Sequence, residues 1–182
     1  MEGAAAVGEM IRKLHDATAS FSLPPCARWN SWFGRDLGGP SKVIGHCDTG
    51  PWNIVARNGL PVGLIDWEFA GPVDPIVELA QACWLNAKLH DDIVAELEGL
   101  PPLAVRAHQV RSILEGYGLP LKQRRGFIEL IIALVIHDTA AQADDVGVTI
   151  NNDPVPAWGM AWRARSAAWI YRYRSFLQNA IS

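Results

Sequence analysis

The sequence is poor in cysteine and has no excess of basic residues. Its three cysteines, Cys26, Cys47 and Cys83, are an odd number without metal-ligand spacing, which argues against a disulfide framework and favours a reducing cytoplasm. The 16 Lys and Arg residues are outnumbered by 19 Asp and Glu residues, so the net charge is −3 at pH 7. A chain of this charge lacks the broad positive surface that binds nucleic acid, and we expect no nucleic-acid partner.

Long hydrophobic runs are absent as well. The longest apolar region, residues 127–136, is interrupted by Glu129 and is too short to span a bilayer. Residues 1–6 lack both the basic start and the apolar core of a signal peptide. We therefore expect a soluble cytoplasmic protein with no membrane partner.

Apolar residues nevertheless make up 49% of the chain, and eight of them are Trp. A chain of 182 residues with this composition is expected to fold as one globular domain with a substantial core. No internal repeat, coiled-coil heptad or low-complexity tract interrupts it.

The segment from residue 43 to residue 68 combines short apolar runs with an unusual density of polar side chains. Two of the runs, at 54–56 and 62–65, are rich in β-branched residues, which favour strands. Between them, Asn58-Gly59 is the strongest short-range signal for a two-residue β-hairpin turn. We therefore predict a hairpin in this part of the chain.

The predicted hairpin brings together side chains that suit a hard cation. It carries Asn53 at one end and Asp66 at the other, and Asp48 precedes Asn53 by five residues on the adjoining loop. Mg²⁺ accepts one or two carboxylate or amide oxygens and fills its other positions with water and phosphate. Each residue also has an ordinary structural explanation, since Asp48 could cap a turn, Asn53 could end a loop and Asp66 could simply terminate a strand.

The pattern His46-x-Asp48-x-x-x-x-Asn53, followed by Ile65-Asp66 at a strand end, resembles the catalytic half of the aminoglycoside phosphotransferase and choline kinase-like family. That family shares the protein-kinase fold. The resemblance implies that Asp48 orients or deprotonates the hydroxyl of a small-molecule substrate, while His46 braces the loop. It also implies that Asn53 and Asp66 hold Mg²⁺ on the phosphates of ATP.

A second stretch, residues 71–80, is similar to the family's Asp-Pro-x-x-Asp-Leu-Ala sequence, with Glu78 where Asp is usual. Asp74-Pro75 predicts a helix N-cap followed by Pro at the first helical position. Because the helix is apolar nearly all round and an unpaired buried carboxylate is costly, we expect Glu78 to meet a backbone or basic partner. Glu78 then either holds the catalytic loop or forms a purely structural ion pair. The resemblance extends over about residues 10 to 90.

The chain before this segment is expected to support it. Apolar residues at helical spacing predict a helix over 2–20, in which His15 is expected to be packed and hydrogen-bonded. Residues 21–40 are rich in Pro and Gly and predict an irregular connector. Its Trp29 and Trp32 either pin the connector to the core or line a substrate cleft.

Helices are predicted for most of the chain after the hairpin. His137 and Asp138 are expected to form a local hydrogen-bonded pair. A cationic amino sugar or amino alcohol could be attracted by acids such as Asp91, Asp92, Glu96, Asp144 and Asp145. Exposed carboxylates on helices are also ordinary. The aromatic stripe of the last helix is either core or an interface and consists of Trp158, Trp162, Trp169, Tyr173 and Phe176. The predicted helices span residues 75–89, 91–98, 103–115, 120–145 and 157–179, with a loop over 146–156.

The expected fold class is mainly α, within the α+β type: the helical C-terminal lobe of a kinase-like phosphotransferase with a small catalytic β-hairpin. We expect residues 1–182 to form one such domain. A leading helix and connector would occupy 1–45, the catalytic loop, hairpin and metal-binding segment 46–70, and a helical subdomain 71–182.

The sequence before His46 has no Gly-rich strand-turn-strand and no apolar strand carrying Lys, the elements with which kinases grip the nucleotide. The N-terminal nucleotide-gripping lobe is therefore expected to be absent or reduced. Three interpretations follow. The chain is an ATP-dependent phosphotransferase, a kinase-like binding protein without turnover, or an accessory subunit or homo-oligomer that pairs through the face left by the reduced lobe.

Overall fold

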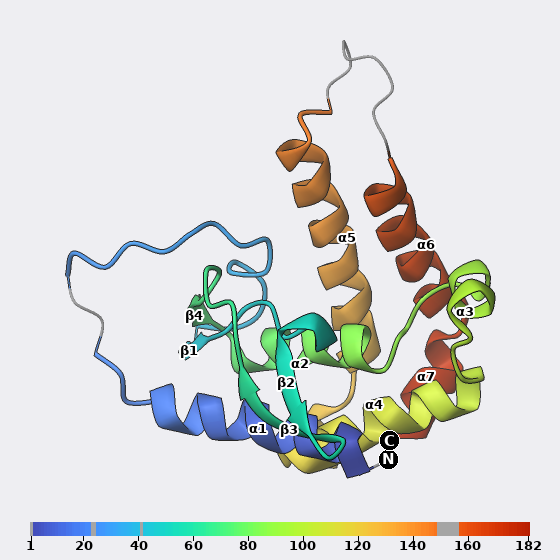
Figure 1. The fold of residues 1–182 in the computed structure, drawn as a ribbon, viewed down its shortest axis with the longest axis horizontal. Coiled ribbons are helices and arrows are strands. Elements are labelled where there is room, and N and C mark those ends of the chain that lie inside the picture. Colours follow the sequence, from blue (N-terminus) through green and yellow to red (C-terminus); the bar gives the residue numbers. More distant parts are fainter. Residues whose placement is uncertain (1, 23–24, 41, 149–156) are drawn as a thin grey trace.

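The computed structural model describes residues 2–22, 25–40, 42–148 and 157–182. Helices dominate these ranges, and the strands form two small sheets of two strands each, which confirms the predicted mainly helical fold with a small β part (Figure 1). The elements in chain order are α1 (Glu2–Thr18), β1 (Val43–Gly45), the 3-10 turn η1 (Pro51–Asn53), β2 (Ile54–Arg57), β3 (Leu60–Leu64), β4 (Gly71–Val73), α2 (Pro75–Asn86), α3 (Asp92–Glu98), α4 (Leu103–Tyr117), the 3-10 turn η2 (Leu121–Gln123), α5 (Phe127–Asp145), α6 (Trp158–Arg172) and α7 (Arg174–Ile181).

The predicted hairpin is present as the antiparallel pair β2–β3. Its turn residues Asn58 and Gly59 have φ values of 52° and 77°, the left-handed conformation that a two-residue type I′ turn requires at both positions. The second sheet was not predicted. It pairs β1 with β4, so that Val43 lies opposite Val73.

Helix α1 lies beneath the hairpin and packs along α4 (Figure 1). The two helices approach so closely that a Cβ atom at Gly8 would collide with the carbonyl oxygen of Ile113, and one at Gly116 with that of Ala5. Glycine at these two positions therefore allows the backbones to meet.

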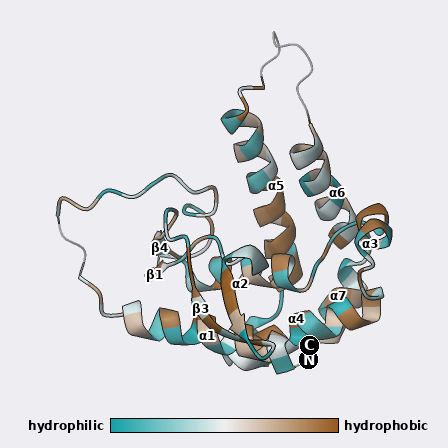
Figure 2. Cartoon of the chain, viewed as in Figure 1, coloured by the Kyte–Doolittle hydropathy of each residue, from teal (hydrophilic) through white to brown (hydrophobic). Residues whose placement is uncertain are grey.

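Helix α2 runs through the middle of the molecule and is the most deeply buried helix. The lower half of α5 is also apolar, whereas the far end of α5 is hydrophilic (Figure 2). The helix begins as predicted, because the Asp74 side chain caps it by accepting a hydrogen bond from the backbone N–H of Ile76 at 2.8 Å. Helix α3 is capped in the same way by Asp91 and ends at Gly99, which has a φ of 61°.

The prediction of one long helix from residue 120 to residue 145 was wrong at its start. Leu121–Gln123 forms the 3-10 turn η2, and α5 begins only at Phe127. Gly126, with a φ of 74°, reverses the chain between them. A left-handed residue cannot continue a right-handed helix, so the apolar pattern of α5 begins after this glycine.

The prediction of a single last helix over 157–179 was also wrong. Tyr173, at φ −99° and ψ 10°, separates α6 from α7. The aromatic stripe is not uniformly buried: Trp169 lies in the core, whereas Trp158 and Phe176 are exposed. Most of the loop predicted over 146–156 lies outside the described residues. Within the described ranges, no helix combines the length and apolar character that a membrane crossing requires.

Candidate active site

The loop between β1 and β2, residues 46–53, is called the Asp48 loop below. Its first residue, His46, is completely buried and ties the loop to the far end of the hairpin. The Nε2–H of His46 donates to the carbonyl oxygen of Ile65 at 2.8 Å, and Nδ1 accepts from the backbone N–H of Asp48 at 3.3 Å. These two contacts together assign the ring proton to Nε2. His46 therefore braces the backbone on both sides of the predicted site.

The structure brings Asp48 and Asn53 into direct contact. The amide Nδ2 of Asn53 donates to the Asp48 side-chain Oδ2 at 2.7 Å and to the Asp48 carbonyl oxygen at 3.0 Å. The indole Nε1–H of Trp52 also donates to Oδ2, at 3.3 Å. Among the described residues, none donates a hydrogen bond to the other carboxylate oxygen of Asp48, Oδ1.

Asp66 follows β3 at the open end of the hairpin and is exposed. Its φ of 63° is unusual for a residue other than glycine or asparagine and turns the chain sharply at this point. The preceding residue, Ile65, is held from two sides, because its N–H donates to the carbonyl oxygen of Asn53 at 3.0 Å and its carbonyl accepts from His46. Asp66 is thus fixed beside Asn53 through the backbone.

Helix α2 supports the Asp48 loop from below. Glu78 is fully buried, and its Oε1 accepts the backbone N–H of Cys47 at 2.6 Å. Its Oε2 meets Nε2 of His15 at 2.5 Å, and Nδ1 of His15 is hydrogen-bonded to the hydroxyl of Tyr117 at 2.9 Å. The predictions for both Glu78 and His15 are confirmed, and Glu78 has a backbone partner and a basic partner at once.

Two further polar residues of α2 hold the same loop and were missed in the sequence. Gln81 accepts a hydrogen bond from the backbone N–H of Thr49 at 3.2 Å and donates to the carbonyl oxygen of Cys47 at 3.3 Å. Asn86 donates to the carbonyl oxygen of Thr49 at 2.8 Å. Two amide side chains within an otherwise apolar buried helix were the signal that could have identified them.

Cys47 lies inside the loop with a φ of 63° and is completely buried. Burial raises the pKa of its thiol far above the ordinary value, and the nearby Glu78 carboxylate acts in the same direction. The side chain therefore remains a neutral thiol, which suits a small packing residue and does not suit a nucleophile or a metal ligand.

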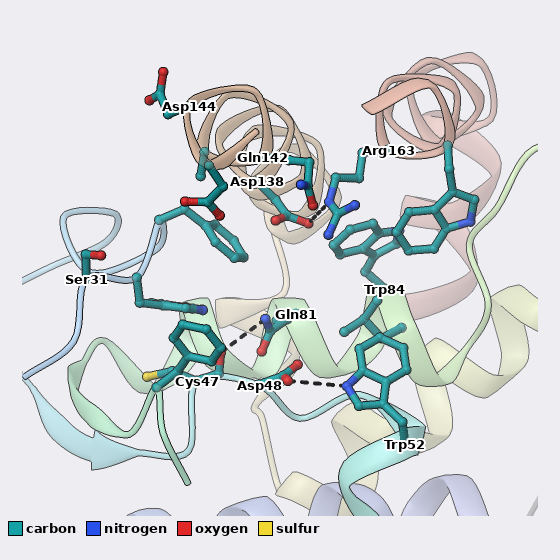
Figure 3. A pocket seen from close by; sticks show the side chains of 17 residues that line it. Ser31, Cys47, Asp48, Trp52, Gln81, Trp84, Asp138, Gln142, Asp144 and Arg163 are labelled. Carbon is teal, nitrogen blue, oxygen red and sulfur yellow. Dashed lines mark hydrogen bonds and ion pairs between the residues drawn. The ribbon is translucent and has the colours of Figure 1, made fainter. Parts of the chain in front are cut away.

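A cavity of about 540 Å³ opens above the Asp48 loop (Figure 3). Asp48 lies on its floor with Trp84 of α2, and Asp138 of α5 and Arg163 of α6 form the opposite wall. The connector contributes Trp32, which both packs into the hydrophobic core and lines this cavity, so it has both of the roles considered for the connector tryptophans.

The predicted pair of His137 and Asp138 does not form among the described residues. His137 is exposed, while Asp138 turns into the cavity and accepts a hydrogen bond from Nε of Arg163 at 2.6 Å. Burial raises the pKa of the Asp138 carboxyl, and the Arg163 guanidinium acts against this rise. The partner of Asp138 comes from a different helix, and residue spacing could not reveal it.

The donor set of the site suits a magnesium ion. No group of three or more His, Cys, Asp and Glu side chains that could hold a metal occurs in the described part of the chain. The site instead offers one amide and one carboxylate. The amide nitrogen of Asn53 is used in hydrogen bonds, whereas its oxygen and the Asp66 carboxylate accept none from the described side chains. Mg²⁺ needs no more than two such ligands when phosphates and water complete its shell.

A helical lobe with an aspartate loop in front of a β-hairpin, and a second acidic residue at the end of that hairpin, defines the catalytic lobe of a kinase-like phosphotransferase. Residues 4–124 match the model of the phosphotransferase enzyme family. The chain belongs to this family.

The chain is also similar to the trifolitoxin immunity protein of Rhizobium leguminosarum bv. trifolii. The two are 58% identical over 176 residues, which cover 96% of this chain and 67% of the relative. No solved structure matches the chain.

Proposed function

We propose that the protein transfers the γ-phosphoryl group of ATP to a hydroxyl group of a small molecule bound in the cavity. The observation that carries this proposal is the position of Asp48. It lies on the cavity floor, and Asn53 and Trp52 fix its Oδ2 while Oδ1 has no donor among the described residues. A substrate hydroxyl in the cavity would donate to Oδ1, which would orient the hydroxyl and accept its proton.

Asn53 and Asp66 would hold Mg²⁺ on the phosphates of ATP. A Mg²⁺ ion held by these two residues would supply positive charge that offsets the negative charge of the phosphates. His46 and Glu78 would act as positioning residues, because each fixes the backbone of the Asp48 loop without facing the substrate. A displacement of about 1 Å in such a site can cost on the order of a hundredfold in rate.

The similarity to a trifolitoxin immunity protein supports a second candidate function, protection against a toxin. The toxin would then be the hydroxyl-bearing substrate, or it would be held in the cavity without transfer. Binding of the toxin without transfer corresponds to the interpretation of the chain as a kinase-like binding protein.

Pairing with another copy through the hairpin face stays a prediction. That face carries exposed apolar side chains, among them Val55, Val62 and Ile65. We take this face of the hairpin as the one left by the reduced nucleotide-gripping lobe. Sedimentation of the purified chain measures whether a second copy covers it.

The first experiment is thermal unfolding of the 182-residue chain with ATP, in Mg²⁺ and in chelator. A ligand at about 100 times its dissociation constant adds roughly 2.7 kcal/mol, worth on the order of 5 to 10 °C for a domain of this size. We expect this rise only with Mg²⁺, and we expect Asp66→Ala to abolish it. Asp36→Ala is the matched control, since Asp36 is an exposed acid that does not line the cavity.

The second experiment separates transfer from binding. Asp48→Asn keeps the shape of the side chain but removes the proton acceptor. We expect it to reduce ATP-dependent phosphorylation of an acceptor, and protection of a trifolitoxin-sensitive strain, by at least about a hundredfold, with the ATP-induced thermal shift retained. Asp36→Asn should leave all three readouts unchanged. Protection that survives Asp48→Asn would favour binding without transfer.

A further inference from the structure

We propose that the cavity selects an amphipathic cation, that is, a hydroxyl-bearing molecule with a bulky aromatic or apolar body and a positively charged group. This inference names the substrate class and rests on the proposed function. It distinguishes such a molecule from polyhydroxylated amino sugars, which carry charge but no apolar body.

The walls of the cavity are largely aromatic. Rings come from the connector, from the Asp48 loop, from the segment after Asp66 and from α2 and α6, so aromatic surface faces the ligand from several directions. Neighbouring rings are in contact, with centroids 5.3 Å apart for Trp84 and Trp162 and 4.8 Å apart for Trp32 and Phe33. An apolar body would gain extensive contact here, whereas a sugar ring would lose water from its hydroxyl groups. The aromatic residues lining the cavity are Trp32, Phe33, Trp52, Phe69, Trp84 and Trp162.

The charges around the cavity are predominantly negative. Among the described residues, four carboxylates and one guanidinium line it, and the guanidinium is that of Arg163, which is engaged by Asp138. The acids at the end of α5, Asp144 and Asp145, are exposed and have no ion-pair partner among the described residues. Carboxylates and aromatic rings that line one cavity both attract a cation, and the Arg163 guanidinium already makes such a contact, 5.3 Å from the centroid of the Trp162 ring.

Two buried hydrogen-bond donors on the same cavity lack a partner. The indole Nε1 atoms of Trp32 and Trp84 make no hydrogen bond among the described residues, although their side chains are 8% and 1% exposed. An unpaired buried donor costs free energy. Both tryptophans line the cavity, so their rings form part of its aromatic wall while their N–H groups are buried behind it.

The positions of the acids also favour one orientation of a ligand in the cavity. Asp48 lies on the side of the cavity formed by the loop, and Asp144 lies on the opposite side at α5 (Figure 3). A ligand with its hydroxyl at Asp48 would direct its cationic group toward the end of α5, where Asp144 and Asp145 line the cavity, with its apolar body against the aromatic lining.

Three small probes test this inference by calorimetry at low salt and without ATP. 2-Amino-1-phenylethanol carries a ring, a hydroxyl and a charge, 1-phenyl-1,2-ethanediol lacks the charge, and 1-amino-2-propanol lacks the ring. We expect the first probe to bind at least about tenfold more tightly than either of the others. Equal affinities, tighter binding of the diol, or no measurable binding of the first probe would overturn the inference.

Substitution of the acids at α5 tests where the charge is recognised. Asp144→Asn with Asp145→Asn should reduce the preference for 2-amino-1-phenylethanol over the diol to less than about threefold and leave the affinity for the diol unchanged. The matched control is Glu96→Gln with Glu98→Gln, which removes the same charge from exposed positions of α3. A control that lowers the preference equally would show only a long-range charge effect and would contradict the inference.

The binding assay tests the proposed substrate class and the transfer assay tests the proposed function, so each proposal can be overturned without the other. The expected order of the probes without any phosphorylation would overturn the proposed function alone. Phosphorylation that favours a neutral or ringless acceptor would confirm transfer and overturn the proposed substrate class.

Discussion

Glu78 of α2 accepts the backbone N–H of Cys47 at 2.6 Å, and this hydrogen bond helps to fix the residue immediately before Asp48. The same carboxylate binds His15 of α1, so one buried side chain connects two helices with the loop. We expect Glu78→Ala to lower the free energy of unfolding by about 3 to 5 kcal/mol, because two buried partners lose their acceptor. Urea unfolding measures this change.

Glu78→Gln is the companion variant, because its amide oxygen can still accept from Cys47. It should lose clearly less stability than Glu78→Ala. Equal losses of under about 1 kcal/mol in both variants would mean that the carboxylate does not support the loop.

A second prediction concerns the space beside this carboxylate. A Cβ atom at Gly45 would overlap the Glu78 carboxylate and approach Cγ1 of Val73 at 2.5 Å. We expect Gly45→Ala to destabilise the fold by about 1 to 3 kcal/mol through overpacking. Gly63, in β3, has nothing within 4 Å of its ideal Cβ and serves as the control. Gly63→Ala should be neutral or stabilising by up to about 1 kcal/mol, and indistinguishable effects of the two substitutions would refute the argument.

A third prediction concerns the packing of α1 against α4. Gly8→Ala would drive a methyl group into the backbone of Ile113 and Tyr117, and backbone cannot move aside as a flexible side chain can. We expect a loss of about 3 kcal/mol or more, measured by thermal or urea unfolding. Gly159→Ala is the helical control, since its Cβ would make only an ordinary contact at 3.4 Å with Arg163. The control should gain up to about 1 kcal/mol from helix propensity, and a stable Gly8→Ala variant would contradict the close packing.

A fourth prediction concerns pH. Burial, helped by the nearby Lys88 and Arg106, lowers the pKa of His90 from 6.5 to about 4. When the pKa of a histidine is lower in the folded state than in the unfolded state, the neutral histidine stabilises the fold at pH values above its unfolded-state pKa. This stabilisation is lost as the pH falls toward the folded-state pKa. We therefore expect the free energy of unfolding to fall by about 3 kcal/mol between pH 6.5 and pH 4, beyond the change seen in a variant without this group.

His90→Phe is that variant, because a phenyl ring retains the ring contact with Trp162, whose centroid lies 4.9 Å away. Denaturation measured at several pH values should give a flatter profile for His90→Phe than for the native chain. Parallel profiles would mean that His90 is not held neutral in the folded protein.

Local signals predicted much of the fold correctly. Asn58-Gly59 specified the hairpin turn, and Asp74-Pro75 specified the start of α2, because each signal acts within a few residues. The β1–β4 sheet escaped prediction since its strands have three residues each and Pro72 stands in the second one. The break at Tyr173 escaped because the apolar pattern continues across it.

The candidate site, too, was predicted from the sequence only in part. His46, Asp48, Asn53 and Asp66 are close in sequence, and their spacing indicated that they would share one region. The cavity depends instead on α5 and α6. The partner of Asp138 is Arg163, 25 residues away on another helix, so only tertiary packing could reveal that pair.

The hydrogen-bonded set of Tyr117, His15 and Glu78 has a consequence for the order of events during synthesis. Its members are separated by 102 and 63 residues along the chain. The Asp48 loop emerges from the ribosome well before Tyr117, and α1 then has no α4 to pack against. Contacts of such long range form late and slow the folding of a domain. A nascent chain that ends shortly after the hairpin should therefore already contain His46, Asp48, Asn53 and Asp66. It should still lack Glu78 and Tyr117, whose hydrogen bonds with His15 and the Asp48 loop support this region.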